Sequence, residues 1–453
     1  IPRNRGVMLP DDRTGRCFVS ACMRDSESWI LELPHGAKVV AANAGDHPLI
    51  QQLLVQTLQT PLEEDFQSRI DDPAYRPSDR LLVRLDDLLT AHVHVSHHVG
   101  MFCGERVPLV WLENFVTLPE YAQAGHDSAL LEVAESTAAQ EGAVLGLTHT
   151  NCAELFGKNA WSALLSQGHT RANVRAILAH LDAQEQARRK RRRSRIEVRA
   201  WRHYELDYVR RLYETMIGSM WGPLCRSENC WQWLIGRKSY DQILLATDRN
   251  ADQDAAALDG VVGYAVVRDS CVVEMFTLPR YSAARIHLLA RACRDAIDRD
   301  HHFVSLHTPA DDPLHELMVT AGGAWVSEGT NGSERWMVKL LSPEKWTERI
   351  YPLLHQRARA AEVPRPFQID LDVEGAEYEM TLTRRSARLE RGKGAAGVAC
   401  TWPSVQNLLL GNRTATNGLV ESVGSLDGAT AQQLAALLPP QLFWQSPFEL
   451  IRP

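Results

Sequence analysis

The chain has 453 residues, of which 45% are hydrophobic, 23% charged and 7% aromatic. At roughly 150 residues per domain this length predicts about three domains. The apolar fraction can fill several cores, so the composition excludes a globally disordered chain. No run of about 18 apolar residues occurs, which excludes a membrane-spanning helix. The net charge of −7 argues against nucleic acid as the partner of the whole molecule.

The beginning of the sequence and its cysteines indicate a compartment. The first residues, Ile1 to Arg5, lead into polar sequence without the apolar core of a secretory signal. The nine cysteines are odd in number and include no Cys-x-x-Cys pair of the kind found in zinc sites. Reduced cysteines are the simpler interpretation, so we expect a cytoplasmic protein.

Residues 1–35 are interpreted as an N-terminal extension, and strand and helix patterns follow them. We expect a strand over 37–42 and a helix that Asp46 caps and that runs through Leu58. Alternating patterns predict strands over 80–85 and 91–99. The nearly continuous apolar run over 107–118 is typical of a central strand buried on both faces.

An internal repeat organises the first two thirds of the chain. The stretch Val116 to Tyr121 (Val-Thr-Leu-Pro-Glu-Tyr) recurs as Phe276 to Tyr281 (Phe-Thr-Leu-Pro-Arg-Tyr). A helix pattern follows each copy, over 128–140 and 286–297, and then a strand pattern that ends in His-Thr, over 143–150 and 303–308. This order predicts a duplicated α+β unit with one parallel crossover in each copy.

A basic run separates the two copies. Arg188 to Arg195 carries seven positive charges in eight positions after a predicted helix over 172–185. Like charges repel one another, so the run indicates an exposed linker, with a nucleic-acid-binding patch as the alternative. The second copy then supplies predicted strands over 196–201, 242–246, 260–267 and 271–278.

The last part of the chain has a different pattern. Two alternating segments, over 367–373 and 378–382, flank Glu374-Gly375 and predict a β-hairpin. A strand over 398–402 follows, with helices over 404–410, ended by Gly411, and over 429–438. The chain is therefore predicted to be α+β, with units over 36–187 and 196–342, a basic linker over 188–195 between them, and a smaller α+β domain over 343–453.

The chemistry is expected where the apolar strand of the first copy meets its helix, over 119–128. The first N–H groups of a helix have no intrahelical acceptor and suit a phosphate. With its strand–Pro–Tyr entry, this stretch resembles the loop of the Gcn5-related N-acetyltransferases that binds the pyrophosphate of acetyl-coenzyme A. The resemblance implies a mixed sheet flanked by helices, and acetyl-coenzyme A as acyl donor. It also implies that the cofactor-binding residues are Phe115, Val116, Thr117, Gln123, Ala124, Gly125, His126, Asp127, Ser128 and Asn151.

The loop departs from the family pattern at two positions. Ala122 stands where that pattern has a basic residue or Gln, and Asp127 stands where it has Gly or Ala. A carboxylate near a pyrophosphate repels it, so binding in the first copy is expected to be weakened. The second copy, over 282–287, has no glycine and is interpreted as having lost the cofactor.

Two such units followed by a domain similar to sterol carrier proteins resemble the enhanced-intracellular-survival family. The Glu374-Gly375 turn and the stretch Gln406 to Gly411 carry the C-terminal part of this resemblance. The resemblance implies an acid for the leaving thiolate at Trp161, where the family has Tyr, and a base at the carboxylate of Pro453. It also implies a homo-oligomer.

Glu113 and four histidines are further candidates. If Glu113 is buried in the central strand, its pKa should be raised, which suits a catalytic base for an incoming ammonium. The alternative is a strand-end Glu that faces solvent or pairs with Arg. His92 and His94 share one face of a strand and lie close to His97 and His98. A structural or surface strand is the favoured interpretation of these histidines, a metal site is the alternative, and no metal is predicted.

The function predicted from these patterns is acetyl-coenzyme A-dependent N-acetylation of a primary amine on a small molecule or peptide. The acidic overall charge favours a cationic acceptor of the aminoglycoside or lysine type. The alternative is a catalytically degenerate tandem scaffold that binds a ligand or partner, and Ala122, Asp127 and Trp161 support it.

Overall fold

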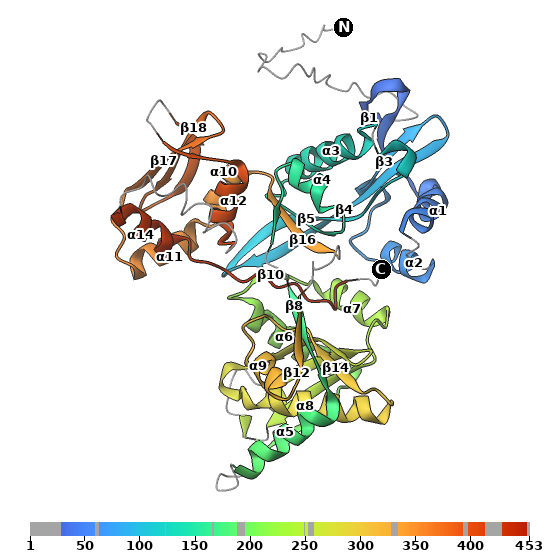
Figure 1. The fold of residues 1–453 in the computed structure, drawn as a ribbon, viewed down its shortest axis with the longest axis vertical. Helices are drawn as coiled ribbons and strands as arrows, with labels where there is room; N and C mark the ends of the chain where they lie inside the picture. The colour runs from blue at the N-terminus through green and yellow to red at the C-terminus, as the bar shows by residue number, and fades with distance from the viewer. Residues whose placement is uncertain are drawn as a thin grey trace.

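The structure is a computed structural model that describes residues 29–58, 63–122, 124–164, 167–187, 195–248, 250–251, 258–327, 334–392, 397–412 and 428–450. The predicted extension is therefore described only from Trp29, and the basic run only at Arg195. Three β-sheets define three lobes, here called the first, second and C-terminal units (Figure 1). Within the described residues, no helix is long and apolar enough to span a membrane.

The first unit contains nine strands in the order β1-β2-β3-β4-β5-β6-β16-β7, with β10 paired to β4. These strands are β1 (Trp29–Glu32), β2 (Lys38–Ala41), β3 (Arg80–Leu85), β4 (Leu88–Phe102), β5 (Glu105–Thr117), β6 (Leu145–Thr150), β7 (Ser162–Ala163), β10 (Trp221–Leu224) and β16 (Arg335–Leu340). Helices α1 (His47–Leu58) and α2 (Glu63–Ile70) pack on one face, and α3 (His126–Gln140) and α4 (Ala153–Lys158) pack on the other. The central strand β5 pairs antiparallel with β4 and parallel with β6.

The N-terminus of α1 corrects one expectation. Asn43 caps the 3₁₀ turn Ala44–Asp46 that leads directly into α1, because Oδ1 of Asn43 accepts the N–H of Gly45 at 2.8 Å. Asp46 instead accepts the N–H of Asn43 at 2.8 Å, which completes a reciprocal capping box three residues later.

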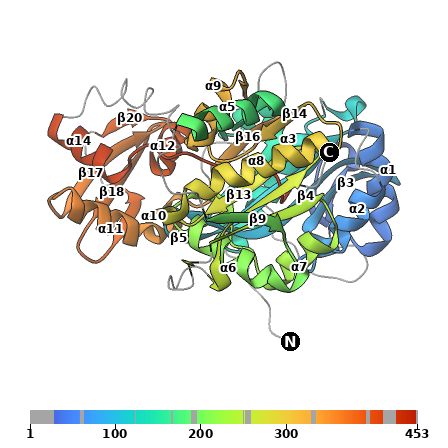
Figure 2. The same ribbon diagram turned by 90° about the horizontal axis from the view of Figure 1, so that it is seen from below.

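The second unit has the strand order β15-β8-β14-β13-β12-β11-β9. These strands are β8 (Gly168–Asn173), β9 (Ile196–Ala200), β11 (Gln242–Asp248), β12 (Val261–Arg268), β13 (Cys271–Thr277), β14 (Phe303–Leu306) and β15 (Ala324–Ser327). Its helices are α5 (Val174–Ala187), α6 (Leu206–Ile217), α7 (Glu228–Gly236), α8 (Ala283–Asp298) and α9 (Pro313–Thr320). Helices α5 and α8 lie side by side (Figure 2). The sequence β13, 3₁₀ turn, α8, parallel β14 repeats β5, 3₁₀ turn, α3, parallel β6, so the predicted duplication of an α+β unit is confirmed.

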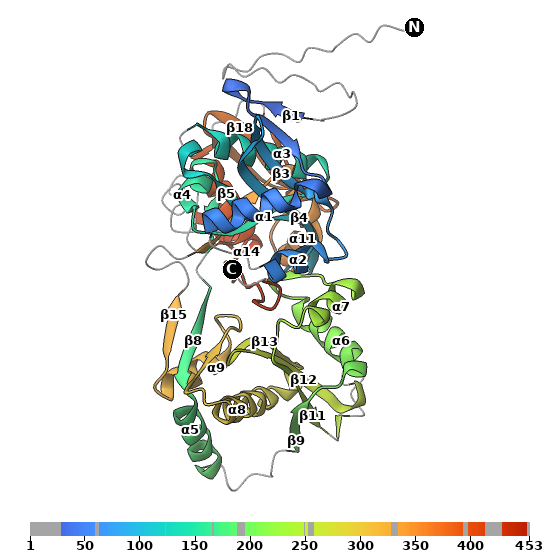
Figure 3. The ribbon, with the colours of Figure 1, turned by 90° about the vertical axis from the view of Figure 1, so that its right-hand side faces the viewer.

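The two sheets exchange strands relative to chain order. β8 precedes the basic run, yet it lies in the second sheet, where it pairs with β14 and, at the edge visible in Figure 3, with β15. β16 comes late in the chain, yet it pairs with β6 and β7 of the first sheet. The predicted boundaries at 187 and 342 therefore do not coincide with the boundaries of the sheets. A hydrophobic pattern shows that a strand is buried but not which sheet buries it.

The C-terminal unit has a four-stranded sheet in the order β19-β18-β17-β20. Its strands are β17 (Phe367–Val373), β18 (Ala376–Leu382), β19 (Ala387–Arg391) and β20 (Val398–Cys400), and its helices are α10 (Pro343–Arg349), α11 (Tyr351–Ala360), α12 (Trp402–Leu410) and α14 (Gly428–Leu437). The predicted hairpin is confirmed, with Val373 opposite Ala376 across a turn in which Glu374 and Gly375 both have positive φ. The likeness to sterol carrier proteins stays a prediction.

A tail formed by residues 441–450 runs from the C-terminal unit between the other two units (Figure 1). Phe443 packs on Trp221 with ring centroids 5.1 Å apart, and the N–H of Trp444 donates to the carbonyl of Trp221 at 2.9 Å. Trp444 and Phe448 are buried in the core of the second unit. The tail therefore connects all three units.

Candidate functional site

The paired central strands of the first unit separate halfway along their length. β5 and β6 pair from Leu109 opposite Leu145 to Leu112 opposite Thr148. Beyond that point β6 continues beside β16. Residues 113–117 of β5 keep β4 on one edge, but no described strand pairs with their other edge. A β-bulge lies at the same point: His94 pairs with Glu113 and His92 with Val116, so β5 carries one extra residue, which bends the strand.

A helix N-terminus follows the open end of β5. The 3₁₀ turn Pro119–Tyr121 leads to Gly125, which precedes α3 with a φ of 78°. This left-handed conformation favours glycine, which has no Cβ. The first amides of α3 have no acceptor within the helix. Because the turn and α3 follow β5 directly, the predicted phosphate loop and the open strand edge lie at the same end of the sheet.

Most of the predicted cofactor-binding residues lie around this opening. Phe115, Val116 and Thr117 lie on the segment of β5 whose edge toward β6 is open, and Asn151 is exposed directly after β6. Oγ1 of Thr117 is buried and has no hydrogen-bond partner. A buried hydroxyl without a partner is costly, so this atom suits a polar group supplied by a ligand. Gln123 lies outside the described residues.

Two side chains of the predicted phosphate loop are already engaged. His126 points inward, with only 5% of its surface exposed, and its Nδ1 lies 2.9 Å from Oγ1 of Thr90. The imidazole of His126 is therefore turned away from the loop, and its backbone amide is the group that remains for a phosphate. Asp127 accepts the N–H of Ser128 at 2.7 Å and so occupies one of the amides that a phosphate would use.

Glu113 is held between α2 and β4. Arg69 forms an ion pair with Oε1, while Nδ1 of His94 lies 3.2 Å and Oγ of Ser96 3.4 Å from Oε2. Burial alone raises the pKa of Glu113, but the Arg69 charge and the His94 hydrogen bond outweigh burial and hold the pKa at about 2. The expected raised pKa is therefore wrong. The alternative of a Glu paired with Arg describes the structure.

His92 forms part of a buried polar chain. Its Nδ1 lies 2.9 Å from the carbonyl of Asn114 at the bulge, and its Nε2 lies 3.1 Å from Nη1 of Arg80. Nε of Arg80 donates to the hydroxyl of Tyr75 at 3.0 Å. These contacts connect the bulge of β5 to β4 and β3 through buried polar side chains. No cluster of three or more His, Cys, Asp or Glu side chains in the described ranges is arranged to hold a metal ion.

Of the predicted acid and base, only the acid, Trp161, lies within the described residues. Trp161 is buried, and its Nε1 donates to Oε1 of Glu135 at 2.6 Å, while Nζ of Lys339 donates to the other carboxylate oxygen. The only polar hydrogen of the Trp161 side chain is therefore engaged in the core, and this geometry does not favour the indole as an acid to a thiolate. Pro453 lies outside the described residues.

The second unit repeats the separation of the strands, but side chains of the tail and of α8 hydrogen-bond to the groups at this point. β13 and β14 pair only at Cys271 and Val272 before they separate. Nε1 of Trp444 in the tail donates to the carbonyl of His307 at 3.1 Å, directly after β14. Arg285 donates to Oγ1 of Thr277 at 3.1 Å, and Thr277 is the repeat partner of Thr117. The hydroxyl left unpartnered in the first unit is therefore satisfied in the second.

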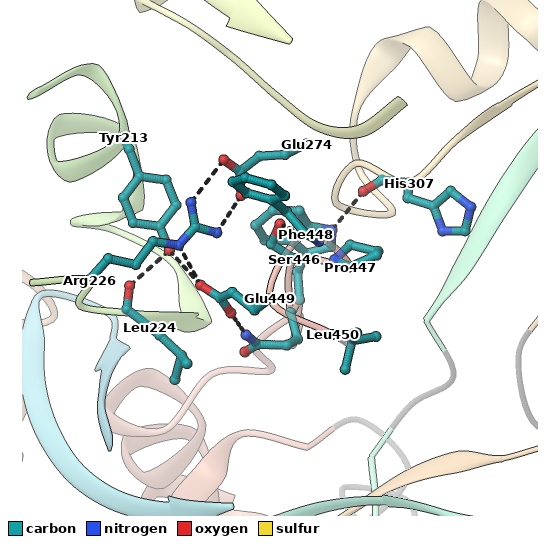
Figure 4. Close-up of polar contacts among 12 residues, drawn as sticks. Tyr213, Leu224, Arg226, Glu274, His307, Ser446, Pro447, Phe448, Glu449 and Leu450 are labelled. Atoms are coloured by element: carbon teal, nitrogen blue, oxygen red, sulfur yellow. Dashed lines mark hydrogen bonds and ion pairs between the residues drawn. The ribbon is translucent and has the colours of Figure 1, made fainter. Parts of the chain in front are cut away.

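A buried ionic network anchors the tail beside this filled opening (Figure 4). Arg226 donates to both oxygens of Glu274, at 3.0 and 2.6 Å, and through Nε to Glu449 of the tail at 2.6 Å. The hydroxyl of Tyr213 donates to the carbonyl of Leu224 and lies 3.3 Å from Glu449. Our sequence reasoning missed this network. The available signal was Glu274, which the repeat aligns with Asn114, the neighbour of Glu113.

The comparisons with known proteins identify the fold. No family model matches the chain, and no curated protein matches it. Among solved structures, the chain is similar to a GCN5-related N-acetyltransferase from Anabaena variabilis ATCC 29413, with a TM-score of 0.66, 13% identity, and coverage of 90% of this chain and 99% of that one. It is also similar to a GCN5-related N-acetyltransferase from Kribbella flavida, with a TM-score of 0.67, 14% identity, and coverage of 90% and 97%. A third similar structure is Eis1 from Mycobacterium abscessus, with a TM-score of 0.59, 14% identity, and coverage of 90% and 99%. At these identities the likeness shows the fold, which is the α+β fold of the Gcn5-related N-acetyltransferases, present twice in this chain.

Proposed function

We propose that this protein is an acetyl-coenzyme A-dependent N-acetyltransferase that acts on a primary amine. The observation that carries the proposal is the open edge of β5 over 115–117, followed at once by the N-terminus of α3. Free backbone amides and carbonyls on a strand edge suit the amide groups of a pantetheine chain. A helix N-terminus suits its pyrophosphate.

The residues present fit this acyl donor in the first unit. The unpartnered hydroxyl of Thr117 can hydrogen-bond an amide of the pantetheine, and the amides of 115–117 can polarise the thioester carbonyl. When bound, acetyl-coenzyme A supplies the acetyl group as a thioester. Among the described residues of the second unit, Trp444 and Arg285 already hydrogen-bond to the carbonyl of His307 and the hydroxyl of Thr277 at the corresponding place.

A cavity between the first and second units suits the acceptor. It has a volume of about 980 Å³ and lies between α2 and α7. Its lining residues are Glu64, Gln67, Ser68, Asp71, Trp233, Gly236 and Arg237. Arg69 connects this wall to the opening, since its guanidinium lies 5.7 Å from the Trp233 ring and also pairs with Glu113. The carboxylates of Glu64 and Asp71 favour a cationic acceptor of the aminoglycoside or lysine type.

Calorimetric titration with coenzyme A tests the cofactor site. We expect one molecule bound per chain. Thr117→Val should weaken binding about fivefold, as loss of one hydrogen bond does, while the matched variant Thr277→Val in the second unit should leave binding unchanged. Absence of binding at millimolar coenzyme A, or equal effects of the two variants, would overturn the assignment.

A non-catalytic scaffold is the second candidate. The observations that favour it are the engaged indole of Trp161 and the Asp127 carboxylate on the Ser128 amide. A thiol-release assay with a panel of amines separates the two functions. Turnover above the rate in buffer rejects the scaffold, and coenzyme A binding without turnover of any amine supports it.

A further inference from the structure

Acetyl transfer to an amine requires a group that accepts a proton, and Glu113 is poorly suited to that task. Its carboxylate is ionised and paired with Arg69, and its pKa of about 2 makes it a weak base. A neutral side chain with a free lone pair at the same place is a better acceptor. His94 lies in contact with Glu113.

The contact with Glu113 fixes the tautomer of His94. An ionised carboxylate can only accept a hydrogen bond, so the hydrogen between Oε2 of Glu113 and Nδ1 of His94 belongs to the imidazole. Nε2 of His94 then carries the lone pair, and no residue in the described ranges hydrogen-bonds to it. A carboxylate that orients a histidine in this way is the arrangement found in hydrolytic triads.

The surroundings keep His94 neutral. Burial, together with the charges of Arg80 on β3 and Arg69 on α2, lowers the pKa of His94 to about 4, although the hydrogen bond and charge of Glu113 on β5 act to raise it. The ring of Tyr75 packs against the imidazole, with centroids 5.6 Å apart. At neutral pH the imidazole therefore holds no second proton and can accept one.

The position of His94 matches the inner end of the opening. His94 is paired with Glu113, the first residue of β5 beyond its last pair with β6. His94 therefore lies at the bulge, where β5 and β6 separate. Arg69, which pairs with Glu113, also lies 5.7 Å from the ring of Trp233, a residue that lines the cavity between α2 and α7.

We infer that His94 is the proton acceptor of the transfer reaction and that Glu113 is the residue that positions it, an inference that rests on the proposed function. In the step, the amine nitrogen forms a bond to the acetyl carbon and the carbon–sulfur bond of the thioester breaks. The proton lost by the nitrogen moves to Nε2 of His94. The thiolate leaves with the sulfur electron pair and takes a proton from solvent. Glu113 stabilises the imidazolium that forms.

Steady-state kinetics on three variants of the full chain provide the test. His94→Gln should lower kcat by about 100-fold or more, the usual contribution of a general base, with the affinity for coenzyme A within about threefold of wild type. Glu113→Gln should also lower kcat. His97→Gln is the matched control. His97 is the next histidine along β4, lies on the opposite face of the strand and pairs with Glu141 at 3.1 Å, so its substitution should leave kcat unchanged.

The pH profile separates positioning from simple structural support. Wild-type kcat/KM should lose activity as His94 takes a proton near pH 4, and Glu113→Gln should move this limb to lower pH, since Glu113 raises the pKa of His94. Nitrogen NMR adds a readout that needs no activity: the His94 signals should show the Nδ1–H tautomer from pH 5 to 8 and vanish in His94→Gln.

Each outcome decides one claim. No turnover by the wild-type protein with any amine refutes the proposed function, and the NMR tautomer still reports on the pair. Turnover with kcat of His94→Gln within threefold of wild type refutes the role of His94 alone. If His94→Gln does not fold, an unchanged acid limb in Glu113→Gln refutes the positioning role.

Discussion

Glu449 is expected to make the docking of the tail depend on pH. Glu449 and Glu274 share one guanidinium, that of Arg226, and Glu274 receives the bidentate pair of hydrogen bonds. Burial raises the pKa of Glu449 to about 7 against the attraction of Arg226, and the charge of Glu274 adds to the rise. One cation cannot neutralise two buried carboxylates, so Glu449 carries a proton in mildly acid solution.

The magnitude follows from the two pKa values. The folded pKa of about 7 lies above the ordinary value of 4.5, so the folded state binds the proton more tightly. The stabilisation is complete below pH 4.5 and is lost as pH rises through 7. At about 1.4 kcal/mol per pH unit the full loss is roughly 3 kcal/mol, of which about 2 to 3 kcal/mol falls between pH 5 and pH 8.

Amide hydrogen exchange over residues 444–449 measures the free energy of opening of the tail. In wild type this free energy should fall by about 2 kcal/mol or more from pH 5 to pH 8 relative to Glu449→Gln, which carries no titrating group there. Glu390→Gln, at an exposed carboxylate in the C-terminal unit, is the control and should behave as wild type. Equal pH dependence in wild type and Glu449→Gln would refute the reasoning.

Two further predictions concern the first unit. Asp127→Gly should tighten coenzyme A binding several-fold, because it frees the Ser128 amide and removes a charge near the pyrophosphate. Titration at low and high salt should show that this gain in affinity shrinks as salt screens the charge. Weaker binding by the variant would contradict this account. Gly146→Ala should destabilise the fold by about 1 to 3 kcal/mol, because its Cβ would lie 2.7 Å from the Trp161 ring, whereas Gly157→Ala meets no atom within 4 Å. Denaturant melts of both glycine variants check this, and equal midpoints would count against the close approach.

The sequence by itself determined the local structure and its duplication. Alternating residues located the hairpin of β17 and β18, and the two Thr-Leu-Pro copies located the strand–turn–helix units in both halves of the chain. It also placed Phe115 to Thr117 and Gly125 at the opening, since the order of strand, turn and helix is a local property.

The tertiary structure alone decided the partners. Arg69 meets Glu113 across 44 positions of the chain, and this contact turns an expected base into an ionised anchor for His94. The exchange of β8 and β16, and the insertion of Trp444 into the second unit, also join distant segments. The hydrophobic periodicity of a strand or helix shows which of its faces is buried, but it does not show which other segment covers that face. Charge, protonation and access at this site depend on that covering partner.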